Sequence, residues 1–134
     1  MKIDHIAIVV ADLEATLAIY TQSLGFEQIY RETIADQGVE EVDLQAGEST
    51  IELLRPLDEN VAIARFRGSA ASKLHHTAYR VEDLRAEIAA LRARGVRMID
   101  EQPRKGAHGN LIAFIHPAST AGVLVELCQQ EHSA

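Results

Sequence analysis

Cysteine is nearly absent from this chain of 134 residues, which contains only Cys128. A single thiol excludes a disulfide within the chain and is typical of proteins from a reducing compartment, so we expect a cytoplasmic protein. Hydrophobic residues, in contrast, make up 47% of the sequence. A chain of this length and composition can bury the core of one domain, and we expect a single domain over residues 1–134.

Basic residues and long apolar runs are also scarce. With 13 Lys and Arg against 20 Asp and Glu, the formal net charge is −7, which gives no electrostatic basis for binding nucleic acid or an anionic membrane. The first apolar run, Ile6 to Ala11, is short and lies between His5 and Asp12. It therefore fits neither a signal peptide nor a membrane span. Any anionic ligand must be held by a local site.

The chain does contain an internal repeat. The segment "IDHIAIVVADL" (3–13) is similar to "LHHTAYRVEDL" (74–84) at a constant offset of 71 residues. The matched positions are His5 with His76, Ala7 with Ala78, Val10 with Val81, Asp12 with Asp83 and Leu13 with Leu84. We therefore predict two related modules, about 1–55 and 73–130, each with a histidine near its start.

The first module has the order strand, helix and three strands. A strand ending at Val10 is followed by Asp12, a good helix N-cap, and by apolar residues at helical spacing until Gly25. Three extended segments follow between turn residues: "FEQIYRE" (26–32), "VEEVDLQ" (39–45) and "TIELLR" (50–55). This order predicts a βαβββ module.

The second module repeats that order after a linker, 56–72, that includes a short predicted helix at 61–67. A strand and then a helix from Asp83 to Gly95 precede the remaining strands: "HHTAYRV" (75–81), "VRMIDE" (96–101), "NLIAFIH" (110–116) and "GVLVELC" (122–128). Each module alone has an exposed edge strand and a small core. We therefore expect an α+β fold in which two βαβββ modules form one curved mixed sheet.

In each module, one glutamate interrupts the last strand, which is otherwise largely apolar. Glu52 lies in "TIELL" and Glu126 in "VLVELC", and a carboxylate on an apolar strand face needs a partner. Each module thus supplies one histidine and one glutamate. Two neutral imidazoles and two carboxylates balance a divalent cation and leave two octahedral positions open for water or substrate. Such a ligand set favours Co²⁺, Mn²⁺, Ni²⁺ or Zn²⁺ over Ca²⁺.

Each of these residues also has an ordinary structural interpretation. A histidine at the start of a strand is usually a hydrogen-bonded structural residue, and a glutamate within a strand usually lies at an edge or in an ion pair. The four residues occupy repeat-related positions, however. This coincidence favours a metal site at His5, Glu52, His76 and Glu126.

The sequence resembles the vicinal oxygen chelate (glyoxalase/bleomycin resistance) superfamily, whose fold pairs βαβββ modules around a metal, and within it the methylmalonyl-CoA epimerase family. The similarity covers nearly the whole chain. Its most specific segments are "PRKGAHG" (103–109) and "HPASTAGVLVEL" (116–127). The resemblance implies the same four metal ligands, with Co²⁺ favoured, although some epimerases have Gln at the position of Glu52.

The resemblance also implies the reaction, which is inversion at C2 of the acyl-CoA thioester methylmalonyl-CoA between its (2R) and (2S) forms. Metal chelation of a thioester oxygen and a carboxylate oxygen would stabilise the enediolate formed on deprotonation. Inversion needs proton exchange on both faces of C2. Glu126 and Glu41 are the implied catalytic carboxylates. Glu41 and Asp43 also fit an ordinary solvated strand face, because they alternate with Val42 and Leu44.

Three other functions belong to the same superfamily. A glyoxalase I, acting on a glutathione hemithioacetal, has the same ligands and a similar enediolate, so substrate alone separates it from an epimerase. A ring-cleaving dioxygenase uses two histidines and one carboxylate, whereas this chain offers a second glutamate. A metal-free binding protein of the bleomycin-resistance kind is expected to lack the ligands. The resemblance also implies a homodimer.

Overall fold

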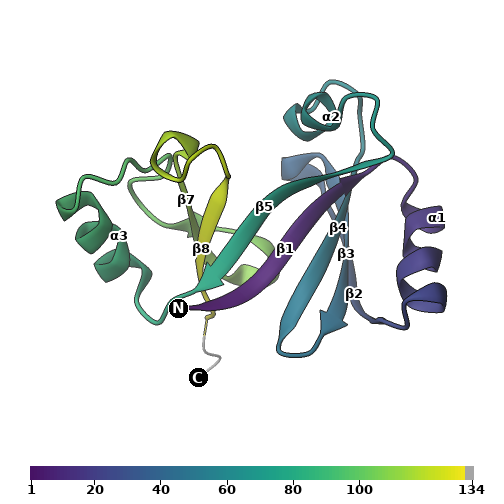
Figure 1. Cartoon of the computed structure of the whole chain (residues 1–134), viewed down its shortest axis with the longest axis horizontal. Coiled ribbons are helices and arrows are strands. Elements are labelled where there is room, and N and C mark those ends of the chain that lie inside the picture. Colours follow the sequence, from purple (N-terminus) through teal and green to yellow (C-terminus); the bar gives the residue numbers. More distant parts are fainter. Residues whose placement is uncertain (132–134) are drawn as a thin grey trace. The chain divides into compact units, whose positions relative to one another are not determined.

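The computed structural model describes residues 1–131 and divides into two compact units (Figure 1). We call the unit formed by His5–His75 the N-unit. The C-unit comprises Met1–Asp4 together with the chain from His76 onward. Strands β1 (Lys2–Val10) and β5 (Ser72–Arg80) contribute residues to both units, so neither unit coincides with a module of the repeat.

The N-unit contains a mixed sheet with the strand order β2-β3-β4-β1. β3 is antiparallel to both of its neighbours, and β4 is parallel to β1. After β1, the elements are α1 (Leu13–Ala18), a π-helical segment (Ile19–Ser23), β2 (Glu27–Ile34), a 3-10 turn (Ala35–Gln37), β3 (Val39–Ala46), β4 (Ser49–Pro56) and α2 (Ala62–Arg67).

The helix α1 covers one face of this sheet (Figure 1). Because side chains alternate along a strand, every second residue of β1, β3 and β4 points to the helix. The resulting core consists of Ile8, Val10, Leu13, Leu17, Val42, Leu44, Ile51 and Leu53. The intervening residues, which include His5 and Glu52, lie on the opposite face.

The start of α1 agrees with the sequence prediction, whereas its end does not. Asp12 caps the helix by accepting a hydrogen bond from the Ala15 N–H at 3.1 Å. The predicted α-helix to Gly25 is wrong, because the chain changes to a π-helix in which the Leu24 N–H donates to the Ile19 carbonyl at 3.0 Å. The extra residue per turn changes the direction of later side chains, and Leu24 is 59% exposed.

The C-unit contains the strand order β5-β8-β7-β6. β5 and β8 are parallel, and β7 is antiparallel to both β8 and β6. After β5, the elements are α3 (Leu84–Ala93), β6 (Arg104–Lys105), a 3-10 turn (Ala107–Gly109), β7 (Leu111–Ile115), a second 3-10 turn (Pro117–Ser119) and β8 (Val125–Gln129).

The helix α3 has the same role in the C-unit as α1 has in the N-unit. Asp83 caps it by accepting a hydrogen bond from the Ala86 N–H at 3.1 Å. Its apolar side packs on the sheet in a core of Val81, Leu84, Ile88, Ala113, Ile115 and Leu127. The repeat in sequence is therefore a repeat of one packing arrangement, in which a capped helix covers one face of a mixed sheet.

One predicted strand, 96–101, is wrong. This segment makes only an isolated bridge between Met98 and Ile115. Asp100 bonds to Phe114 in two ways: its N–H donates to the Phe114 carbonyl at 3.3 Å, and its side chain accepts a hydrogen bond from the Phe114 N–H at 2.8 Å. Pro103 then interrupts the chain before strand pairing resumes. The paired strand, β6, comes later and has two residues.

The α+β class, the order of two βαβββ modules and the short helix in the linker are confirmed. The predicted last strand starts later than expected, at Val125, because Gly122 adopts a φ of +93° in a turn. Within residues 1–131, no helix has the length and apolar character needed to cross a membrane.

Candidate functional site

The N-unit brings His5 and Glu52 together on adjacent strands. β1 and β4 are parallel, with Ala7 opposite Glu52, so His5 and Glu52 share the sheet face that α1 does not cover. The His5 Nε2 lies 3.4 Å from the Glu52 Oε2. The two residues are 6% and 8% exposed.

The C-unit repeats this arrangement with His76 and Glu126. β5 and β8 are parallel, with Ala78 opposite Glu126. The His76 Nε2 lies 3.6 Å from the Glu126 Oε1, and the two residues are 7% and 5% exposed. In both units the glutamate therefore lies opposite the second residue after the histidine, so the pairing follows from strand register.

The spacing within each pair is compatible with binding to a common ion. N–H···O hydrogen bonds normally measure about 2.7–3.2 Å, which is shorter than the 3.4 Å and 3.6 Å found here. Two ligands at about 2.1 Å from one ion lie about 3.0 Å apart at a right angle and about 3.4 Å apart at the tetrahedral angle. Each pair thus fits two neighbouring ligands of a divalent metal. The four ligands predicted from the sequence form these two pairs, one in each unit.

Glu41 and Asp43 lie on the same face of the N-unit sheet as its His–Glu pair. Asp43 is opposite Glu52, and Glu41 is opposite Leu54. Their exposures are only 3% and 2%, so the alternative of an ordinary solvated strand face is wrong. Burial of two carboxylates beside a third costs free energy unless protonation, hydrogen bonds or a cation compensates their charge. Glu41 therefore stays a candidate for proton transfer.

Tyr30 and Glu32 extend this acidic face across β2, and sequence reasoning missed both. Tyr30 is opposite Asp43, and Glu32 is opposite Glu41. The Tyr30 hydroxyl donates a short hydrogen bond to a Glu32 carboxylate oxygen. This bond, followed by partial burial and the charge of Glu32, raises the pKa of Tyr30 to about 12. The signal available in the sequence was the alternation of Tyr30, Glu32 and Ile34 on one side of β2.

The corresponding face of the C-unit has a different composition. Phe114, rather than an acid, lies opposite Glu126, and its ring makes a T-shaped contact with the His76 ring at 5.3 Å between centroids. The Arg104 guanidinium lies 5.4 Å from the centre of the Phe114 ring. The sequence analysis placed Phe114 in the strand predicted at 110–116 and missed its contact with His76. We refer to these two surfaces as the His–Glu faces of the N-unit and the C-unit.

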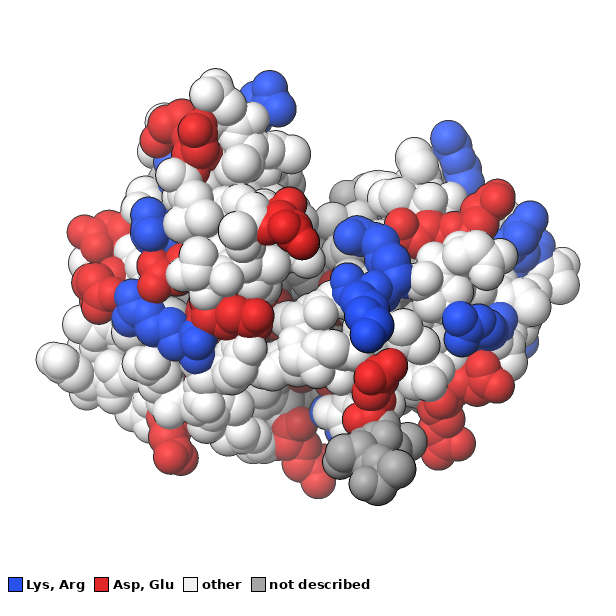
Figure 2. All heavy atoms as spheres, turned by 180° about the vertical axis from the view of Figure 1, so that it is seen from behind, with Lys and Arg blue, Asp and Glu red and all other residues white. Residues whose placement is uncertain are grey.

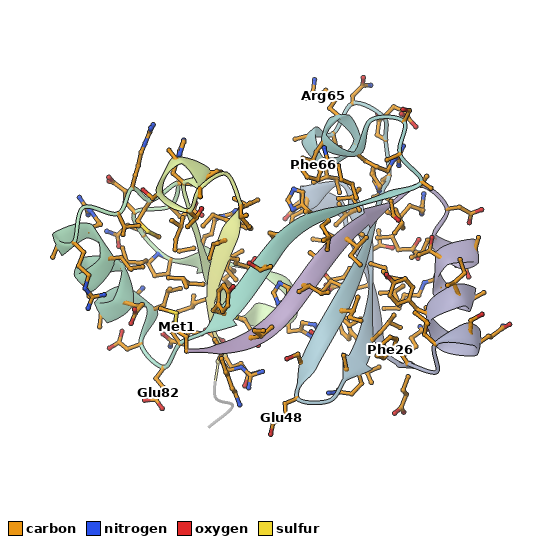
Figure 3. The ribbon with its side chains drawn as sticks, in the orientation of Figure 1. Met1, Phe26, Glu48, Arg65, Phe66 and Glu82 are labelled. Carbon is orange, nitrogen blue, oxygen red and sulfur yellow. The ribbon has the colours of Figure 1, made fainter. Side chains whose placement is uncertain are left out.

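His75, the neighbour of His76 in sequence, has a different environment. Its ring makes a T-shaped contact with Phe66 of α2, which is labelled in Figure 3, at 4.9 Å between centroids. Burial lowers the pKa of His75, so its imidazole is neutral near pH 7. This residue therefore belongs to the packing between α2 and β5.

The lone cysteine shows no sign of reactivity. Cys128 is 2% exposed and forms no disulfide. Burial, together with the nearby carboxylates of Asp4 and Glu126, raises the pKa of its thiol. A protonated, buried thiol is a poor nucleophile and a poor metal ligand, so the two His–Glu pairs stand out as ligands.

Charge is distributed unequally between the units. The N-unit has 12 acidic and 5 basic residues, whereas the C-unit has 8 of each. The whole net charge of −7 thus belongs to the N-unit. In Figure 2, blue side chains are interspersed with red ones toward the right of the view. An anionic ligand therefore meets less electrostatic repulsion from the C-unit.

Comparison with known proteins gives the family. A sequence profile of the glyoxalase/bleomycin resistance protein/dioxygenase superfamily matches residues 4–114. The ethylmalonyl-CoA/methylmalonyl-CoA epimerase of Cereibacter sphaeroides is 39% identical, over 96% of this chain and 97% of its own length. The human mitochondrial methylmalonyl-CoA epimerase is 35% identical, over 96% of this chain and 73% of its own length.

Solved structures of methylmalonyl-CoA epimerases are also similar to this chain. The crystal structure of the methylmalonyl-CoA epimerase from Mycobacterium tuberculosis matches with a TM-score of 0.90 and 37% identity, over 98% of this chain and 89% of that one. A variant of the Streptomyces coelicolor methylmalonyl-CoA epimerase, in complex with 2-nitronate-propionyl-CoA, matches with a TM-score of 0.89 and 36% identity, over 97% and 94% of the two chains.

The fold and the matched profile define a member of the glyoxalase/bleomycin resistance/dioxygenase superfamily. Two relatives that align with nearly the whole chain, at 39% and 37% identity, are methylmalonyl-CoA epimerases. The chain belongs to the methylmalonyl-CoA epimerase family of that superfamily.

Proposed function

We propose that this protein is a metal-dependent epimerase that interconverts the (2R) and (2S) forms of methylmalonyl-CoA. The observation that carries the proposal is the recurrence of one His–Glu pair in both units, at 3.4 Å and 3.6 Å and with the same strand register. The names of the relatives supply the substrate class, because one acts on ethylmalonyl-CoA and methylmalonyl-CoA and another binds an acyl-CoA analogue.

We further propose that His5, Glu52, His76 and Glu126 hold one divalent ion. The family resemblance favours Co²⁺, and the nitrogen and oxygen ligands also suit Mn²⁺, Ni²⁺ or Zn²⁺. This requires residues 1–134 to act as a single domain. Such an ion would act as a Lewis acid toward the thioester and carboxylate oxygens of the substrate and so stabilise the enediolate. The burial of all four side chains favours this role, because a bound cation offsets the cost of burying two carboxylates.

The proposed proton transfers use Glu126 and Glu41. One carboxylate removes the proton from C2, and the conjugate acid of the other returns a proton to the opposite face. The burial of Glu41, 3% exposed, supports its assignment, because a carboxylate shielded from water transfers protons to substrate rather than to solvent. The roles of the two glutamates exchange when the reaction runs in reverse.

The remaining proposals concern the partners of the enzyme. An acyl-CoA thioester is the expected partner molecule, and a homodimer is the expected assembly. A single cysteine is typical of proteins from a reducing compartment, for which we propose the cytoplasm.

Hydrogen exchange at C2 tests this function directly. The protein is loaded with Co²⁺ and incubated in D₂O with one C2 epimer of methylmalonyl-CoA, and inversion and deuterium at C2 are followed by chiral chromatography and mass spectrometry. We expect inversion with incorporation of one deuterium. The metal-free protein and the Glu126→Gln variant measure the background, because the C2 proton also exchanges slowly without enzyme.

Failure of this test has a defined meaning. If the loaded protein binds one Co²⁺ per chain and neither inverts nor exchanges the substrate, the epimerase proposal is wrong. The hemithioacetal of methylglyoxal and glutathione is then the next substrate, and its turnover would indicate a glyoxalase I.

A further inference from the structure

We infer that Phe114 is a positioning residue that fixes the orientation of the His76 imidazole, and that Asp100 and Arg104 hold Phe114 in place. The inference deepens the proposed function, since it concerns one ligand of the proposed metal site. All four residues belong to the C-unit.

The first observation is the geometry of the ring contact. The Phe114 and His76 rings lie 5.3 Å apart at an interplanar angle of 88°, which is a preferred arrangement for aromatic pairs. Phe114 also lies opposite Glu126 across β7 and β8. One side chain therefore packs against the histidine of the pair and is the cross-strand neighbour of its glutamate.

The second observation is the way in which Asp100 organises both Phe114 and Arg104. One carboxylate oxygen of Asp100 accepts a hydrogen bond from the Phe114 N–H at 2.8 Å. The other accepts from the Arg104 Nε at 3.2 Å. The guanidinium so held lies 5.4 Å from the centre of the Phe114 ring. Asp100 thus fixes the main chain of Phe114 and also the cation over its ring.

A histidine ligand requires such support. The terminal torsion of a histidine side chain has a broad distribution of angles, so the ring must lose this freedom before Nε2 can face an ion. Groups that orient a ligand typically affect metal affinity by about 10- to 100-fold when they are changed. In the N-unit, the position opposite the glutamate belongs to Asp43, so the residue that corresponds to Phe114 there is a carboxylate.

The experiment separates orientation from metal binding. Proton NMR of the metal-free protein measures NOEs between the ring protons of His76 and Phe114, with His76→Gln used to assign the histidine signals. Titration with Co²⁺, followed by visible absorption, then gives the metal affinity. For Phe114→Leu we expect a folded protein with unchanged stoichiometry and a Co²⁺ affinity about 10- to 100-fold weaker. Phe114→Tyr retains the ring and should bind as the wild type does.

The chain offers a matched control. Phe26, labelled in Figure 3 below α1, packs against the N-unit core and Tyr20, so Phe26→Leu removes an aromatic ring without touching His76. We expect its Co²⁺ affinity to equal that of the wild type. Arg104→Gln, at a side chain that is 50% exposed, loosens Phe114 without opening the core and should weaken binding by a smaller factor.

Two results would overturn the inference. One is an absence of NOEs between the His76 and Phe114 rings, which would show that the rings are not held together. The other is an unchanged affinity in both Phe114→Leu and Arg104→Gln. If Phe114→Leu does not fold, Arg104→Gln and the NOEs decide. A wild-type protein that binds no Co²⁺ would refute the proposed metal site, and the NOEs would still decide the positioning.

Discussion

The two His–Glu faces contain the same pair of residues, a histidine and a glutamate, but different residues surround the pair. On the N-unit face, the residue opposite the glutamate is Asp43, and Glu41 is buried beside it. On the C-unit face, the residue opposite the glutamate is Phe114, which contacts the histidine ring. The N-unit has a charge of −7, whereas the C-unit is neutral.

This difference shows which positions of the repeat keep the same residue and which positions diverge. The histidine and the glutamate recur because their pairing follows from parallel strand register, which both units share. The position opposite the glutamate has no such constraint. It provides a carboxylate in one unit and an aromatic ring in the other. Proton transfer is thus proposed beside one pair and mechanical support beside the other.

The largest expected effect distinguishes the two glutamate ligands. Glu126→Gln should reduce inversion by about 10²- to 10⁴-fold, because it removes a proton-transfer group as well as a charged ligand. Glu52→Gln should retain one ion per chain and most activity, since an amide oxygen can still bind the metal. Steady-state kinetics with metal analysis checks the pair. Equal losses in both variants would show that the two units contribute alike.

The next prediction concerns the acidic neighbours of the N-unit pair. Glu41→Gln should bind metal normally and lose inversion by about 10²- to 10⁴-fold. With one base left, one epimer should still exchange its C2 proton for deuterium without inverting. Mass spectrometry measures the exchange, and chiral chromatography measures the inversion. The matched variant is Asp43→Asn, which should retain inversion. Normal inversion by Glu41→Gln would end its proposed role.

A smaller effect tests how far the two units resemble each other. Asp12 and Asp83 cap α1 and α3 with the same 3.1 Å hydrogen bond, so Asp12→Ala and Asp83→Ala should each lower the free energy of unfolding by about 1 kcal/mol. Urea denaturation measures both. Asn is also a good cap, and the corresponding Asn variants should stay close to the wild type. A large difference between the Ala variants would mean that the caps are not equivalent.

The smallest expected effect is a pH dependence specific to the N-unit. The hydrogen bond to Glu32 raises the pKa of Tyr30 from 10.0 to about 12. Since the pKa is higher in the folded protein, this stabilisation is fully present below pH 10 and is lost as the pH rises toward 12. The pKa of Tyr30 is measured by ultraviolet titration, as the difference between the titration curves of the wild type and the Tyr30→Phe variant. Glu32→Gln should lower it, and an unchanged value would exclude Glu32 as the cause.

The ligand pairs were predictable because they depend on patterns that a sequence displays. The repeat places His5 and His76 at matched positions, and Glu52 and Glu126 are charged residues within apolar strands. Strand alternation and register then bring each pair together. In the structure, each histidine lies beside the glutamate of its own unit, at 3.4 Å and 3.6 Å. The meeting of the two pairs at one ion stays a prediction.

Other features depend on interactions that no periodic pattern reveals. The strand predicted at 96–101 is replaced by a segment in which the Asp100 side chain binds the main chain of Phe114. The end of α1 depends on a π-helical segment that starts at Ile19, and nothing in its apolar spacing indicates this. Phe114 had the sequence signature of an ordinary strand residue. Its contact with His76 depends on which strand lies beside β8.

The assignment of Met1–Asp4 to the C-unit has a consequence for folding during synthesis. The ribosome completes the N-unit, His5–His75, before it makes the chain from His76 onward. Asp4 can form its ion pair with Arg80 only after Arg80 has been made. In the folded protein, the Arg80 Nη2 lies 2.8 Å from the Asp4 Oδ1. Domains fold as units, the N-terminal one first. Here residues that are made before the N-unit reach their place only after the C-unit has been made.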